Sequence, residues 1–174
     1  TVCVLGLGLI GMQIALMLKK FGFEVVGWSR TKKHISGIKT YNEKDGLIKA
    51  TSVADYTIGI LPETKETSGL LNLEILKKFK KEAVLINIGR GSLIVEQDLL
   101  KVLDDGILQG ATLDVVQKEP MPVEHPFWSH PKIVITPHVS GWNVDDAIVT
   151  IASNYRRIVA NQPLLFEVDR GRGY

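Results

Sequence analysis

Short apolar runs alternate with longer segments of helical periodicity along most of this sequence. The apolar runs predict buried strands at Val2–Leu5, Glu24–Trp28, Tyr56–Leu61, Ala83–Asn87, Ala111–Val115 and Ile133–Thr136. Helices are predicted between some of these strands, at Gly11–Phe21, Leu73–Phe79 and Glu96–Asp105. Strands that alternate with helices pair in parallel through right-handed crossovers. The order therefore predicts an α/β fold, a doubly wound parallel sheet covered on both faces.

The pattern changes after Trp142. Asn143 is a good N-cap for a further helix, and Asp146 suits the positive end of that helix. Apolar residues then recur three and four positions apart, at Val144, Ala147, Ile148, Ile151, Ala152, Tyr155, Ile158 and Val159. Residues 162–174 have the composition of a tail without a core of its own. We expect residues 1–141 to form one domain and residues 142–174 to form a helix with a tail.

Composition narrows the class of protein. The chain has 174 residues, which favours one main domain, and its 45% hydrophobic and 23% charged residues are ordinary globular values. A net charge of +2 gives no electrostatic reason to expect nucleic acid as a partner. Cys3 is the single cysteine, so neither a disulfide framework nor a zinc cluster is expected, and a cytoplasmic location is the default. The apolar stretch 2–18 is shorter than the roughly 20 residues of a membrane span, so no membrane partner is expected.

A glycine-rich segment is the first chemical signal. Residues 6–11 read G-L-G-L-I-G and lie between a predicted buried strand and a predicted helix. This pattern binds the pyrophosphate of a dinucleotide on the helix N-terminus, with glycines for the tight turn, the close approach and the helix packing. Cofactor contacts are therefore expected at Gly6, Gly8, Leu9, Ile10 and Gly11, in a Rossmann domain. Glycines that serve close packing alone, or a methyltransferase-type nucleotide site, are the alternatives.

The end of the second predicted strand indicates which dinucleotide binds. An NAD site has Asp or Glu about 20 residues after the glycines, where it accepts a hydrogen bond from the ribose. Here Ser29, Arg30 and Thr31 stand instead, followed by Lys32 and Lys33. Arg30 with the two hydroxyls suits a 2′-phosphate. The sequence therefore favours NADP over NAD, against the alternative of a solvated basic helix start.

Three separate residues follow predicted strand ends, where open α/β sheets place their ligands. Arg90 lies in N-I-G-R-G, Glu119 in D-V-V-Q-K-E-P and His138 in T-P-H-V-S-G. Each alone is compatible with a plain structural role: a surface arginine, a loop carboxylate and a structural histidine. His34, His125 and His130 lack such a setting and are interpreted as structural.

Together, these motifs resemble the D-isomer-specific 2-hydroxyacid dehydrogenase family, whose signatures run G-x-G-x-x-G, N-x-x-R-G, D-V-…-E-P and P-H-x-[SAG]-G. All occur here in that order, so the resemblance covers residues 2–161. The segments 28–30, 125–128 and 168–174 look most like the glyoxylate/hydroxypyruvate reductase branch.

The resemblance implies roles for individual residues and a small 2-oxo or 2-hydroxy acid as substrate. His138 would move a proton at the substrate carbonyl, Glu119 would orient His138, and Arg90 would bind the substrate carboxylate. Contacts with the nicotinamide half of the cofactor are implied for Ile88, Arg90, Asp114, His138 and Gly141, and contacts with the adenosine half for Leu61, Pro62 and Thr67.

The resemblance also implies what lies beyond this sequence. Family members carry a substrate-binding domain, built mostly from residues before the glycine motif, and the resemblance predicts that this sequence lacks it. The C-terminal helix and tail would pack toward it. The family pairs through its cofactor domains, so a homodimer is expected, with the helix after Asn143 as a candidate contact. A dinucleotide-sensing, corepressor-like module, or oxidation of a one-carbon or phosphorus donor, are alternative functions.

Overall fold

The computed structural model describes residues 1–141 and 144–171, and the chain divides into two compact units, Thr1–His138 and Val139–Tyr174. The first unit alternates strands and helices in the order β1 (Val2–Leu5), α1 (Leu9–Lys20), β2 (Val25–Trp28), β3 (Lys39–Tyr41), α2 (Glu43–Thr51), β4 (Tyr56–Gly59), α3 (Leu73–Leu76), β5 (Ala83–Asn87), α4 (Glu96–Asp104), β6 (Leu108–Leu113) and β7 (Ile133–Ile135). The second unit contains α5 (Val144–Val159).

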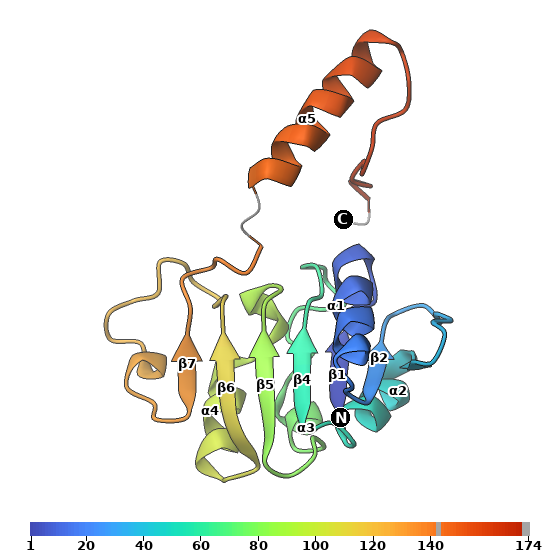
Figure 1. The fold of residues 1–174 in the computed structure, drawn as a ribbon. Coiled ribbons are helices and arrows are strands. Elements are labelled where there is room, and N and C mark those ends of the chain that lie inside the picture. The colour runs from blue at the N-terminus through green and yellow to red at the C-terminus, as the bar shows by residue number, and fades with distance from the viewer. Residues whose placement is uncertain (142–143, 172–174) are drawn as a thin grey trace. The chain divides into compact units, whose positions relative to one another are not determined.

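All strands of the first unit form one sheet in the order β3-β2-β1-β4-β5-β6-β7, and every neighbouring pair is parallel (Figure 1). The order reverses between β1 and β4, as in a doubly wound sheet. The predicted fold class is therefore confirmed.

Several predicted elements differ in extent, and β3 and α2 were not predicted. Strand β3 has three residues, none of them buried, so it lacks the apolar run of a central strand. Gly46 interrupts the periodicity of α2. The helix predicted over 73–79 ends at Leu76, and β6 begins at Leu108, three residues before its predicted start, because Gln109 and Gly110 break the apolar pattern there.

Alternate residues of the central strands pack into different clusters on the two faces of the sheet. Cys3 and Leu5 of β1 join the larger cluster, which includes residues of α2, α3 and α4. Val4, between them, joins the smaller cluster with Ala15 of α1. Side chains alternate between the faces of a strand, so β1 is buried on both sides.

Cover on the α1 face becomes thinner toward β7. One row of registered residues crosses this face, in the order Val4, Ile58, Ile86, Thr112 and Val134. Val4 is fully buried, Ile86 and Thr112 are half-buried, and Val134 is 59% exposed. Within the first unit, the predicted cover on both faces is present at β1, whereas Val134 of β7 is exposed.

Two glycines allow α1 to start directly against β1. Gly6 has a φ of +110°, and a Cβ there would lie 2.7 Å from the Ile60 carbonyl oxygen. A Cβ on Gly11 would lie 1.7 Å from the Gly6 carbonyl oxygen. Any larger residue at Gly11 would therefore push the helix away from the strand.

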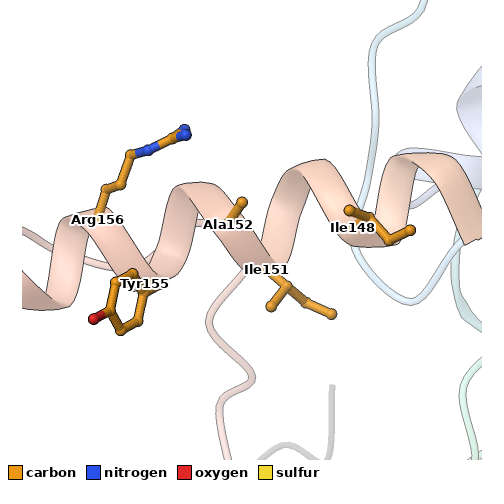
Figure 2. A pocket seen from close by; sticks show the side chains of 5 residues that line it. All are labelled: Ile148, Ile151, Ala152, Tyr155 and Arg156. Atoms are coloured by element: carbon orange, nitrogen blue, oxygen red, sulfur yellow. The ribbon is translucent and has the colours of Figure 1, made fainter.

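In the second unit, the segment after α5 folds back along the helix. The Asn154 side chain accepts a hydrogen bond from the Leu165 N–H at 2.8 Å and donates one to the Leu165 carbonyl at 3.1 Å. Arg157 donates to the Pro163 carbonyl. Figure 2 shows the side chains that line a pocket along α5: Ile148, Ile151, Ala152, Tyr155 and Arg156. The predicted N-cap, Asn143, lies outside the described residues.

The described part of the chain contains no helix that is both long and apolar enough to cross a membrane.

Candidate active site

The parallel strands all point the same way, so the segments that follow them leave one edge of the sheet (Figure 1). Ligands of doubly wound sheets bind at this carboxyl edge. Most residues that the sequence singled out follow β1, β2, β4, β5, β6 or β7.

The segment after β1 can hold an anion. Helix α1 begins at Leu9 with Gly8 as its N-cap, and no side chain of the described residues caps it. The first amides of a helix lack intrahelical acceptors, and the helix dipole is positive there. A Cβ on Gly8 would meet no atom within 4 Å, and Leu9 and Ile10 are exposed. The glycine turn therefore leaves room for a pyrophosphate against the amides.

The segment after β2 carries the basic group. Ser29 is buried, and its hydroxyl donates to the Thr31 carbonyl at 2.8 Å, which shapes the turn that holds Arg30. Arg30 and Thr31 are exposed. The hydrogen bond from Thr64 and, more weakly, the positive charge of Arg30 hold the pKa of the Glu66 carboxyl below its usual range. Arg30 therefore acts electrostatically on the segment after β4.

The segment after β4 forms a wall beside the glycine turn. Leu61 is buried, and a Cβ on Gly6 would lie 3.2 Å from its Cδ2. The Thr67 hydroxyl donates to the Pro62 carbonyl at 2.6 Å and accepts from the Thr64 N–H at 2.9 Å. Thr67 thus shapes this segment through contacts within it, while Pro62 stays partly exposed.

The segment after β5 presents Arg90 to solvent. Asn87 is fully buried; its side chain donates to the Arg90 carbonyl at 2.9 Å and accepts from the Gly89 N–H at 3.2 Å. The Arg90 guanidinium donates to the Gly89 carbonyl. Ile88 is half-buried next to this turn. Asn87 therefore sets the backbone from which the exposed Arg90 side chain extends.

Asp114 directly follows β6 and is hydrogen-bonded to the end of β5 and to the residue after β7. Its N–H donates to the Asn87 carbonyl at 2.9 Å, and its buried carboxylate accepts a hydrogen bond from the Thr136 hydroxyl at 2.5 Å. Thr136 lies two residues before His138. The Asp114 side chain therefore fixes the chain that leads to His138.

Glu119 and His138 form the pair at the centre of the site. Glu119 Oε2 lies 2.7 Å from His138 Nδ1, and Glu119 Oε1 accepts the Val116 N–H at 3.1 Å. His138 has a φ of +54°, which is uncommon for a residue with a side chain. Such backbone strain is often found at functional sites.

The environment of Glu119 keeps its carboxylate ionised. Partial burial raises the pKa of the Glu119 carboxyl, but the hydrogen bonds from His138 and from the Val116 N–H together lower it more. The net pKa lies below the usual value. The ionised carboxylate therefore serves as the hydrogen-bond acceptor for His138 Nδ1.

The structure brings together some predicted residues and leaves others apart. Glu119 meets His138, and the glycine turn meets Leu61. Gly141 belongs to the second unit, and its position relative to the site is not described. Sequence reasoning gave no role to Asn87 or Thr136, although Asn87 follows a buried strand within the N-x-x-R-G motif. Among the described residues no group of three or more His, Cys, Asp or Glu could hold a metal ion.

Comparison with known proteins agrees with this geometry. Residues 1–140 match the model of the D-isomer specific 2-hydroxyacid dehydrogenase NAD binding domain. A glyoxylate/hydroxypyruvate reductase A of Photorhabdus laumondii is 42% identical over 172 residues, which is 98% of this chain and 55% of that protein. The chain thus spans about half the length of this curated relative.

Solved structures similar to this chain belong to the same family. A D-isomer specific 2-hydroxyacid dehydrogenase from Xanthobacter autotrophicus in complex with NADPH is 39% identical, with a TM-score of 0.94 over 99% of this chain and 72% of that one. An NADPH-dependent glyoxylate/hydroxypyruvate reductase from Sinorhizobium meliloti, in complex with NADP and sulfate, is 37% identical, with a TM-score of 0.93 over 99% of this chain and 56% of that one. This chain belongs to the D-isomer specific 2-hydroxyacid dehydrogenase family, in which it matches the NAD-binding domain.

Proposed function

We propose that these residues form the cofactor-binding half of an NADP-dependent reductase of small 2-oxo acids, such as glyoxylate or hydroxypyruvate. The observation that carries the proposal is the 2.7 Å contact between Glu119 and His138. It joins the segments after β6 and β7 at the carboxyl edge, where Arg90 also stands. The names of the relatives support the substrate class.

His138 is proposed to move the proton of the reaction. Its Nδ1 faces Glu119, which leaves Nε2 to meet a substrate oxygen. Imidazole titrates near neutral pH, so His138 can donate a proton to a carbonyl oxygen and take it back from a hydroxyl. The ionised Glu119 fixes the orientation of the ring through its hydrogen bond with Nδ1. The nicotinamide, when bound, supplies or accepts the hydride at C2 of the acid.

Arg90 is proposed to bind the substrate carboxylate. Its guanidinium presents a planar fork that matches two carboxylate oxygens. The Asn87 hydrogen bonds hold the Arg90 backbone in place. An arginine exposed to water holds a carboxylate weakly, so this role requires a second wall that excludes solvent.

The remaining predicted contacts are proposed to hold the cofactor. Gly6, Gly8, Leu9, Ile10 and Gly11 would hold the pyrophosphate through the amides of α1. The turn over residues 29–31 would bind the 2′-phosphate through Arg30, and the segment with Leu61, Pro62 and Thr67 would lie along the adenosine half. Ile88, Asp114 and Gly141 would lie along the nicotinamide half.

We propose a homodimer as the assembly. Helix α1 has an outer face of exposed apolar side chains, Leu9, Ile10, Met12, Leu16 and Met17. Helix α5 has exposed apolar residues of its own, Ile148, Val149, Ile151, Tyr155, Ile158 and Val159. Monomers seldom leave such patches in water, and an isologous contact would bury the same patch twice.

A cytoplasmic location is also proposed. Cys3 is the single cysteine and is fully buried, and its burial raises the pKa of its thiol far above the usual value. A buried neutral thiol is unreactive. The chain therefore offers no cysteine chemistry that suits an oxidising compartment.

The Arg30→Ala variant tests the assigned cofactor. Loss of a charge-assisted hydrogen bond to the 2′-phosphate should weaken NADPH binding roughly tenfold or more and change NADH binding by less than about threefold. Isothermal titration calorimetry measures both affinities. Lys78→Ala, which removes an exposed charge after α3, is the matched control. Equal losses for the two cofactors would remove the 2′-phosphate role.

Residues 1–174 by themselves should bind NADPH without turnover. The cofactor contacts all lie within them, whereas Arg90 is open to water. Joining these residues to the remainder of the Photorhabdus laumondii relative should restore reduction of glyoxylate or hydroxypyruvate, measured by NADPH absorbance. A rate on the order of 1 s⁻¹ or more from residues 1–174 alone would contradict this account.

The His138→Ala variant of that joined protein tests the proton-transfer role. Removing a general acid should lower kcat by about 10²- to 10⁴-fold while the NADPH affinity changes little. His34→Ala, which removes an exposed histidine elsewhere, should leave kcat unchanged. Full turnover in His138→Ala would eliminate the assignment, because another group would then have to move the proton.

Light scattering at tens of micromolar tests the dimer. A mass of about twice 19.3 kDa is expected for residues 1–174. Ile151→Asp should shift the mass toward the monomer if α5 forms the contact, and Met17→Asp should do so if α1 forms it, because a buried charge is costly. Val123→Asp, at an exposed apolar residue in a loop, should change nothing. A monomeric wild type counts against the proposal.

A further inference from the structure

The segment that carries Glu119 lies directly on the segment that carries Arg90. A Cβ on Gly91 would lie 2.0 Å from the Val116 carbonyl carbon and 2.5 Å from the Gln117 nitrogen. Only a glycine permits such an approach. The peptide that follows Arg90 is therefore in backbone contact with the peptide that precedes Gln117, and small movements in one segment are transmitted to the other.

Gln117 joins the two segments by two hydrogen bonds. Its side-chain Nε2 donates to the Ile94 carbonyl at 2.7 Å. Its backbone N–H donates to Glu96 Oε1 at 3.0 Å. Ile94 lies between Arg90 and α4, and Glu96 is the first residue of α4. Gln117 is therefore fixed at both its side chain and its backbone, two residues before Glu119.

Glu96 is itself held from the other side. Its Oε2 lies 3.2 Å from His125 Nε2, and both side chains are about four-fifths buried, at 19% and 18% exposure. His125 Nδ1 accepts the Phe127 N–H at 3.3 Å, so the ring proton is on Nε2 and points to Glu96. The His125 ring also packs edge-on against the buried Phe127. Both carboxylate oxygens of Glu96 thus have a partner.

We infer that Glu96 and Gln117 are positioning residues, which fix the Glu119–His138 pair relative to Arg90. The hydrogen bonds of Glu96 and Gln117 are called the clamp below. The inference rests on the proposed function, because that function requires the proton donor and the carboxylate-binding arginine at a set spacing. Without these contacts, Gly91 and Val116 would still touch, but the turn from Val116 to Glu119 would lose its hydrogen bonds to Ile94 and Glu96. Geometry of this kind governs rate, since misplacement by about 1 Å can cost about 10² in kcat.

The pKa of the Glu119 carboxyl can show whether the clamp exists, and its measurement does not require an active enzyme. Besides the Val116 N–H, the groups that affect the Glu119 carboxyl are His138, whose hydrogen bond lowers its pKa, and Asp114, whose charge raises it. If the clamp holds Glu119 in place, loss of the clamp weakens the contacts of Glu119 with His138 and Val116. The pKa of Glu119 then rises toward the ordinary value.

Carbon-13 NMR titration of the Glu119 carboxyl in residues 1–174 measures this pKa. Glu96→Ala should raise it toward the ordinary value of a glutamate carboxyl, because the hydrogen bonds that lower this pKa are weakened. Gln117→Ala, at an exposed residue whose loss leaves the core intact, should raise it in the same direction by less. Glu74→Ala is the matched control, because it removes a carboxylate paired with Lys44 away from the clamp, and should leave the pKa unchanged. An unchanged pKa in both Glu96→Ala and Gln117→Ala, with the fold retained, overturns the inference.

A second readout uses the protein joined to a substrate-binding part. Both clamp variants should lower kcat by roughly tenfold or more, with NADPH affinity unchanged, because cofactor contacts lie outside the clamp. Wild-type kcat in both variants overturns the inference. If the joined wild-type protein shows no turnover, the proposed function fails, while the NMR result still decides whether the clamp exists.

Discussion

The parallel register of β5, β6 and β7 is the constraint from which the site follows. The ladder continues one residue beyond each strand: the Asp114 N–H donates to the Asn87 carbonyl at 2.9 Å, and the Thr136 N–H donates to the Leu113 carbonyl at 3.0 Å. The segments that carry Arg90, Glu119 and His138 therefore leave the sheet at a common level. Backbone hydrogen bonds of buried strands are costly to break. Hydrogen bonds of Asn87, Asp114 and Thr136 hold the segments of Arg90 and His138 to this rigid sheet.

The local chemistry then follows from short-range contacts. Glu119 stays ionised because the hydrogen bonds from His138 and Val116 together outweigh the cost of its partial burial. His138 adopts a positive φ that the register and the Thr136 contacts hold in place. The glycine turn depends on positions that lack side chains. Gly11 packs closely against the Gly6 carbonyl, and Gly8 leaves open space for a ligand. Rigid elements that hold reactive groups before a ligand arrives reduce the cost of ordering them later.

The sequence was sufficient for features that rest on local patterns. The strand–helix alternation predicted the parallel sheet, and each predicted catalytic residue follows a strand end, as Arg90 does after β5. Contacts between residues far apart in the sequence could not be predicted in this way. The partners of Glu96 are Gln117 and His125, 21 and 29 positions away, and no spacing rule links them. His125 was interpreted as structural from its sequence setting, and its contacts with Glu96 and Phe127 are of that kind. The edge strand β3 was not predicted because its residues are polar and partly exposed.

The claim that the carboxyl edge of the sheet binds the dinucleotide can be tested residue by residue. Nitrogen-15 amide spectra of residues 1–174, recorded during titration with NADPH, locate the ligand directly. We expect the largest shift changes at Gly6–Gly11, at Ser29–Thr31 and at Asp114, with little change at Lys80–Glu82, which precede β5 at the opposite edge. Changes centred on Lys80–Glu82, or saturation with NADPH that leaves Gly6–Gly11 unmoved, would contradict the account.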